Sequence, residues 1–264
     1  MTCKNCHTPL LENDTYCSQC GGKVIKKRLS LRNLFEHVSE TFFNYDNKLL
    51  RTLIDVFRRP ELVIDGYVNG VRKRYVNPIS FFGVSLTLSG LSVFIIKKFF
   101  LDELDFSYMF DSELFNNPAS QEIMKQSNDL SFEYSSLILS GMIPFMAIMS
   151  ILTFIDKRYN FTEHIIIYLY SMSAISIVSV FASLSILLLV PEQYLTYTLI
   201  LYVAMFVHNA YILKRIFKLS ALQLILRSLL FFVIFIIFYI IFSVIVAIIF
   251  LATGDIEKFK PKTS

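Results

Sequence analysis

The chain has 264 residues, of which 55% are hydrophobic and only 17% are charged, and it contains 26 phenylalanines but no tryptophan. A soluble globular protein of this length could not solvate so much apolar surface, so the composition excludes that class and predicts an integral membrane protein. The net charge of +4 is small, and the charged residues are unevenly placed along the chain.

All four cysteines lie near the N-terminus, as two Cys-x-x-Cys pairs formed by Cys3 with Cys6 and Cys17 with Cys20. Two residues between paired cysteines let a tight turn direct both sulfurs at one tetrahedral ion, so this spacing predicts a structural zinc ribbon over residues 1–25. So short a segment cannot bury a core, and metal binding would supply its folding free energy. Four thiolates also close the coordination sphere, which argues against catalytic zinc. Unliganded or redox-active thiols are the alternative.

The first cysteine pair runs directly into His7, and Cys-x-x-Cys-His is also the attachment motif of a c-type haem. Haem attachment of this kind and cytosolic zinc binding occur in different compartments. The residues after Met1 are polar and are followed by several lysines rather than by an apolar export signal. The sequence therefore favours zinc, with His7 as a bystander rather than a ligand.

Residues 26–78 are predicted to form cytosolic juxtamembrane helices. Apolar residues recur at helical spacing over 49–57 and again over 63–71, and Pro60 between them suits the first turn of a new helix. Two short amphipathic helices are the natural interpretation. They would lie either in the lipid headgroup layer or against the ends of the membrane helices, and the sequence does not separate the two. The candidate contacts with a ligand or partner in this region are Arg59, Tyr67, Arg72, Lys73, Arg74 and Tyr75.

Five apolar segments are long enough to cross a bilayer as helices, at residues 79–100, 135–155, 165–190, 195–213 and 229–251. They define a predicted transmembrane domain over residues 79–251, with an acidic loop at 102–134 and a polar tail at 252–264. The expected fold is thus an all-α polytopic membrane protein with about five transmembrane helices and a small N-terminal zinc ribbon.

The distribution of Lys and Arg predicts the orientation of these spans. The first 78 residues and the connections at 156–160 and 214–218 are basic, whereas the loop at 102–134 is acidic. This pattern places the N-terminus in the cytoplasm and both the acidic loop and the C-terminus outside. The basic tail fits an outside position less well, so four or six spans remain open.

Ionisable side chains within the spans are rare, and they mark candidate sites for a proton, a metal or a ligand. His208 lies late in the fourth span, and Glu163 with His164 opens the third. A hydrogen-bonded histidine at the membrane interface is the plainer explanation of His208. The sequence does not show that His164 and His208 meet.

The cysteine pairs, the stretch KLLRTLIDVFRRPELVIDGYVNGVRKRYVNP and the later Glu163-His164 together resemble the bacterial membrane proteins of domain-of-unknown-function family 3667. The juxtamembrane part of the resemblance is a signature carried by Thr52, Arg59, Pro60, Tyr67, Gly70, Arg72, Tyr75 and Pro78. The resemblance implies an N-terminal zinc ribbon and a multi-span domain, and it implies no assigned activity.

No nucleophile elbow, phosphate-binding loop, metalloprotease pair or nucleotide fingerprint is present, so the sequence does not support an enzyme. The basic residues lie beside the membrane, which explains them without nucleic acid. We therefore expect a non-catalytic binding or scaffolding module of the bacterial inner membrane that contacts membrane lipids. Its zinc ribbon would dock either a protein partner or the protein's own basic juxtamembrane helices.

Two other interpretations remain. One is a transporter or lipid-handling protein with a cavity between the spans near Glu163, His164 and His208. The other is a membrane enzyme that uses these same three side chains, which would have to lie within hydrogen-bond reach of one another or share a water or metal.

Overall fold

The computed structural model describes residues 1–22, 24, 48–100, 130 and 133–253. The chain divides into two compact units, Met1–Lys48 and Leu49–Ser264, which we call the cysteine unit and the helical unit. Nearly all of the predicted acidic loop at 102–134 and of the tail at 252–264 lies outside the described residues.

The described residues of the helical unit form helices, whereas those of the cysteine unit form turns and short bridges, among them a β-bridge between Thr2 and Pro9. The helices are α2 (Lys48–Arg58), α3 (Pro60–Val68), α4 (Pro78–Phe99), α6 (Ser135–Thr153), α7 (Phe161–Leu189), the 3-10 turn η3 (Pro191–Gln193), α8 (Tyr194–Phe217) and α9 (Ala221–Thr253). Five of them, α4 and α6 to α9, are long and apolar enough to cross a membrane. The predicted all-α polytopic fold is confirmed.

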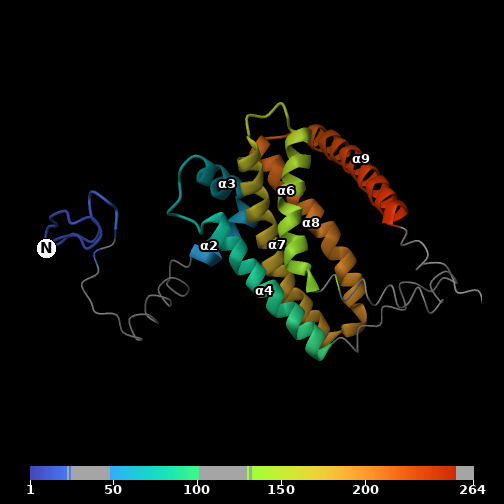
Figure 1. Ribbon diagram of the computed structural model, residues 1–264, viewed down its shortest axis with the longest axis horizontal. Helices are drawn as coiled ribbons and strands as arrows, with labels where there is room; N and C mark the ends of the chain where they lie inside the picture. The colour runs from blue at the N-terminus through green and yellow to red at the C-terminus, as the bar shows by residue number, and fades with distance from the viewer. Residues whose placement is uncertain (23, 25–47, 101–129, 131–132, 254–264) are drawn as a thin grey trace, which may run out of the picture. The chain divides into compact units, whose positions relative to one another are not determined.

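Helix α7 lies at the centre of the helical unit and packs against α4, α6 and α8 (Figure 1). Small hydroxyl side chains connect these helices. Ser176 of α7 lies 2.8 Å from Ser89 of α4, oxygen to oxygen, and Ser171 donates a hydrogen bond of 2.6 Å to Asn209 of α8. Hydroxyl and amide groups of this kind join helices where the surrounding lipid offers no other partner.

Two helices begin earlier than the apolar segments alone indicate, because each has a reciprocal cap. Asn160 and Glu163 exchange backbone and side-chain hydrogen bonds, so α7 begins at Phe161. Ser220 and Gln223 make the same exchange before α9. This capping box satisfies backbone N–H groups that a helix start otherwise leaves unpaired.

Helices α2 and α3 pack against the ends of α7 and α8. Val56, Val63 and Ile64 are fully buried in a core that also contains Ile167 of α7 and Ile212 of α8. An ion pair between Glu61 of α3 and Arg215 of α8 lies at the edge of this contact. On α2, Leu50 and Ile54 remain exposed. One side of α2 is thus covered by protein.

Helix α9 leans away from α6 and α8 along its length (Figure 1). Its aromatic contacts with the other helices join Phe235 and Phe238 to Phe145 of α6, and Phe232 to Phe206 of α8. The apolar side chains described along α9 are mostly exposed. In a membrane these side chains face lipid, so the exposure is consistent with a spanning helix.

Candidate metal centre and juxtamembrane network

Four cysteine sulfurs converge in the cysteine unit. The Sγ atoms of Cys3 and Cys20 are 3.6 Å apart, those of Cys6 and Cys17 are 3.5 Å apart, and all four lie within 4.8 Å of one another. A tetrahedral ion with metal–sulfur bonds of about 2.3 Å would hold its ligands about 3.8 Å apart, whereas a disulfide needs about 2 Å. The four free thiols therefore fit one metal ion rather than two disulfides.

The two Cys-x-x-Cys turns repeat the same backbone hydrogen bonds. In the first turn the Cys3 N–H donates to Thr8 O at 2.8 Å and the His7 N–H donates to Cys3 O at 2.9 Å. In the second turn the Cys17 N–H donates to Gly22 O at 2.8 Å and the Gly21 N–H donates to Cys17 O at 2.9 Å. Each turn folds its own pair of sulfurs toward the centre, so the site is built from two equivalent halves.

His7 occupies the position that Gly21 holds in the second turn. Both residues have left-handed backbone angles, with φ of 58° at His7 and 68° at Gly21. Glycine adopts this conformation without steric cost, whereas a side chain at the same angles costs roughly 1 kcal/mol. His7 of the CKNCH motif therefore lies at the end of the first cysteine turn, at a position where the backbone is left-handed and glycine would fit better.

Hydrogen bonding and burial divide the cysteines by acidity. The Thr8 hydroxyl lowers the pKa of Cys6 to about 6. Backbone hydrogen bonds from Cys20 and Gln19 act to lower the pKa of Cys17, but burial and the neighbouring thiols raise it to about 11. Sulfurs this close cannot all ionise unless a cation lies between them, so a bound metal ion would change the protonation of the whole set.

Asp55 is the buried carboxylate of α2, and nearby side chains provide its hydrogen-bond and ion-pair partners. It accepts a hydrogen bond of 2.8 Å from the Tyr75 hydroxyl and one of 3.1 Å from Arg59 Nη2. One turn earlier, Thr52 Oγ1 accepts the Val76 N–H at 3.0 Å. Burial, aided by Asp55, raises the pKa of Tyr75. These bonds fix the segment that leads into α4 against α2.

Tyr67 and Tyr170 make further hydrogen bonds to the segment that leads into α4. The Tyr170 hydroxyl of α7 donates to Val76 O at 2.7 Å, and Asn77 Nδ2 donates to the Tyr67 hydroxyl at 3.3 Å. The Asn77 side chain also caps α4 by accepting the Ile79 N–H at 2.9 Å. We call this set the juxtamembrane network, and its members are Thr52, Asp55, Arg59, Tyr67, Tyr75, Val76, Asn77 and Tyr170.

The predicted contact residues of this region thus fall into two groups. Arg59, Tyr67 and Tyr75 belong to the juxtamembrane network, whereas Arg72, Lys73 and Arg74 are exposed. The Arg72 guanidinium lies 5.5 Å from the centre of the Tyr67 ring, and that of Arg74 lies 5.4 Å from the Tyr75 ring. These cation–π contacts hold two positive charges at the surface of the network.

Glu163, His164 and His208 have different surroundings. Glu163 belongs to the α7 cap. His164 is fully buried, its Nδ1 lies 2.9 Å from Ser150 Oγ, and its ring lies 5.9 Å from that of Phe217. The His208 ring lies 4.4 Å from Phe57 of α2. The structure therefore does not gather the three side chains into one set.

The Nε2 atoms of His164 and His208 are both buried and have no hydrogen-bond partner within the described part of the chain. His208 also lines an apolar groove of about 480 Å³ between α7 and α8.

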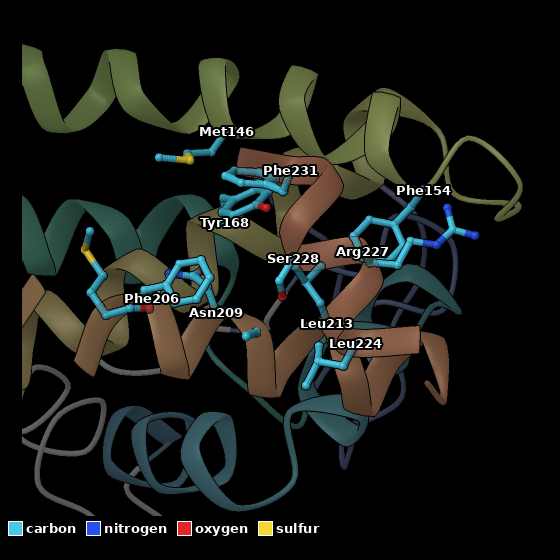
Figure 2. Close-up of a pocket in the computed structure, with 12 residues that line it drawn as sticks. Met146, Phe154, Tyr168, Phe206, Asn209, Leu213, Leu224, Arg227, Ser228 and Phe231 are labelled. Carbon is cyan, nitrogen blue, oxygen red and sulfur yellow. Dashed lines mark hydrogen bonds between the residues drawn. The ribbon is translucent and has the colours of Figure 1, made fainter. Parts of the chain in front are cut away.

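Arg227 is a charged residue of α9 that lies outside the predicted last span. The segment predicted as the last span began at residue 229, whereas α9 begins at Ala221 and includes Arg227. The Ser220–Gln223 capping pattern is the sequence signal that would have revealed it. Arg227 lies beside a second cavity, of about 100 Å³, that side chains of α6, α7, α8 and α9 enclose (Figure 2).

A family model described as protein of unknown function (DUF3667) matches residues 46–90. This range includes α2, α3, the first half of α4 and most of the juxtamembrane network, and it does not include the four cysteines. The predicted resemblance is confirmed over this segment. No curated protein and no solved structure matches the chain.

Proposed function

We propose that this protein is a non-catalytic, multi-pass protein of the bacterial inner membrane whose cysteine unit is a zinc ribbon that binds a protein partner on the cytoplasmic side. The observation that carries the proposal is the closed set of four sulfurs in a unit separate from the membrane helices. With four protein ligands the ion has no open position for a substrate, so its role is to hold a folded surface.

The cysteine unit has a small core and exposes large apolar and aromatic side chains. Its core consists of Cys3, Leu10 and Cys17, with Cys6 and Val24 packed against them. Leu11 is 77% exposed and Tyr16 is 57% exposed. Leu11 and Tyr16 are therefore the residues that we propose contact the partner, since aromatic residues often supply much of the binding energy of an interface.

Metal analysis of the purified chain tests the first part of the proposal. We expect about one zinc ion per chain in the wild type and none in Cys17→Ser, because removal of one thiolate opens the site. Iron also accepts four thiolates, and an iron centre would give a coloured protein. Iron as the bound metal, or no metal in protein purified without chelator, would overturn the zinc assignment.

Cross-linking in native membranes followed by mass spectrometry tests the second part. We expect a partner that is captured by the wild type and lost with both Cys17→Ser and Leu11→Ser. Lys4→Ser is the control, because it alters an exposed polar residue of the same unit and leaves the sulfurs and Leu11 in place. The same captured proteins from wild type and Leu11→Ser would contradict a partner surface at Leu11.

The second candidate function is the handling of lipid, and the groove of about 480 Å³ beside His208 favours it. Its walls come from α7 and α8, with Phe57 of α2 at one end and His208 as the ionisable residue. A transport or lipid-transfer role predicts that Ala204→Trp, which fills the groove, reduces lipid exchange between vesicles. Unchanged exchange with Ala204→Trp would exclude this groove as the path.

A further inference from the structure

The cavity beside Arg227 combines an apolar interior with a charged rim. Met146 of α6, Leu213 of α8 and Phe231 of α9 form apolar walls, and Phe154 lies at the end near Arg227 (Figure 2). A volume of about 100 Å³ is somewhat below that of a protein cavity known to hold benzene, so the space accepts a short length of hydrocarbon chain. The apolar side chains described along α9 are mostly exposed, so in a membrane lipid would lie next to the helix that forms one wall of the cavity.

Arg227 brings a positive charge to this rim. Its Nη1 lies 2.8 Å from Asp156 Oδ1 and donates a hydrogen bond to Thr153 O, and its guanidinium lies 5.5 Å from the centre of the Phe154 ring. A guanidinium also carries donors on Nη2 and Nε, in a planar fork that suits phosphate. A basic side chain near the end of a membrane helix reaches the level of the lipid headgroups.

The connection that faces Arg227 adds further positive charge. Asp156 is followed by Lys157 and Arg158, so this short segment carries two positive charges against one negative charge even before Arg227 is counted. Asp156 alone therefore does not neutralise the rim. An excess of basic residues at the end of membrane helices attracts anionic lipid headgroups.

We propose that this site binds one anionic phospholipid, with part of an acyl chain in the cavity between α9 and the other helices and the phosphate held by Arg227 and Lys157. The apolar walls favour a lipid over a soluble anion, and the positive rim favours an anionic lipid over a zwitterionic one. The site is independent of the zinc ribbon and of the α7–α8 groove, so it does not rest on the proposed function.

Native mass spectrometry of the full chain tests the site, with phosphatidylglycerol and phosphatidylcholine of identical acyl chains as probes. We expect the wild type to retain phosphatidylglycerol preferentially, and Arg227→Gln to weaken this retention about fivefold, the effect of one basic side chain at an anionic surface. Arg215→Gln is the matched control, because Arg215 is also ion-paired near a helix end but does not line the cavity. It should leave the preference unchanged.

Two further variants separate lipid binding from a purely structural role of Arg227. Asp156→Asn removes the competing carboxylate and should strengthen phosphatidylglycerol retention, whereas a structural ion pair predicts no gain. Ser228→Phe fills the cavity with all charges intact and should reduce retention. These two variants also test the site if Arg227→Gln does not fold.

The proposal fails if Arg227→Gln and Arg215→Gln behave alike, or if neither Asp156→Asn nor Ser228→Phe changes retention. It also fails if inorganic phosphate displaces the lipid completely, because the site would then recognise a free anion rather than a lipid.

Discussion

His7 and Gly21 occupy equivalent positions in the two halves of the cysteine unit. Because glycine cannot bind a metal ion through a side chain, this equivalence indicates that His7 shapes the turn and is not a ligand. His7 has φ of 58°, in the region that glycine prefers. If His7 were a metal ligand, its replacement by glycine would weaken metal binding. If His7 only occupies a left-handed turn, glycine should fit the same backbone better and stabilise the unit.

We therefore predict that His7→Gly keeps one metal ion per chain and holds it at least as tightly as the wild type. His7→Val should weaken metal retention, because a β-branched residue fits this backbone poorly. Competition with a zinc chelator, followed by elemental analysis, measures both. Loss of metal in His7→Gly would identify His7 as a ligand.

Asp55 illustrates how a charge can be kept inside the juxtamembrane region. Its carboxylate depends on the Tyr75 hydroxyl and on Arg59. Tyr75→Phe keeps the ring but removes the hydroxyl donor, so we expect the free energy of unfolding to fall by about 1–3 kcal/mol. Thermal unfolding in detergent measures this change.

Tyr202→Phe is the control for Tyr75→Phe, because Tyr202 is 63% exposed on α8. We expect the double variant Asp55→Asn with Tyr75→Phe to lose less stability than the two single losses added together, since the two groups interact directly. Equal effects of Tyr75→Phe and Tyr202→Phe would show that the buried hydrogen bond contributes nothing measurable.

At the scale of elements, the contact between α3 and α8 contains an acid-sensitive ion pair. The hydrogen bond from Arg215 holds the pKa of Glu61 below its ordinary value of 4.5. A lowered pKa in the folded state adds stability above the unfolded pKa, and that stability is lost as the pH falls through the folded pKa. Both side chains are partly exposed, so the contribution is at most about 1 kcal/mol.

We predict that acidification from pH 7 to pH 3 lowers the unfolding temperature of the wild type by about 2 °C more than that of Glu61→Gln. Asp65 acts in the opposite direction, since burial raises its pKa and its neutral form favours the folded state at low pH. Comparison of the two proteins cancels most of the Asp65 effect. A parallel decline of both unfolding temperatures would refute a contribution from the ion pair.

The five membrane helices were predictable because long apolar segments have few alternatives in a bilayer. The start of α9 was misplaced because hydropathy alone ignores capping, and Ser220 with Gln223 extends the helix into a more polar segment. The Cys-x-x-Cys spacing predicted that the sulfurs would converge, since each pair lies in one tight turn and only ten residues separate the two pairs. Contacts over long sequence separations, such as Tyr170 with Val76, have no local signature and required the structure.

At the scale of the whole molecule, the cysteine unit and the helical unit have separate cores. The sulfurs and Leu10 hold the first, while Val56, Ile64 and their neighbours on α7 and α8 hold the second. Removal of a metal ion should therefore unfold one unit and leave the other folded.

We predict that a strong zinc chelator makes residues 1–24 sensitive to protease without changing the unfolding temperature of the helical unit. Limited proteolysis with mass spectrometry, together with a thermal unfolding curve, measures the two effects. Cys17→Ser should behave as the chelated wild type does. A lower unfolding temperature after chelation would mean that the two units stabilise each other.

The length of α9 has a consequence for the membrane itself. Its 33 residues extend about 50 Å, of which the apolar stretch at residues 229–251 makes up about 35 Å, while the hydrocarbon layer of a bilayer is about 30 Å thick. A helix longer than the layer around it accommodates the difference by tilting, and a thinner bilayer demands a greater tilt. Because α9 forms one wall of the cavity beside Arg227, we expect the thickness of the bilayer to affect the width of that cavity through the tilt of α9.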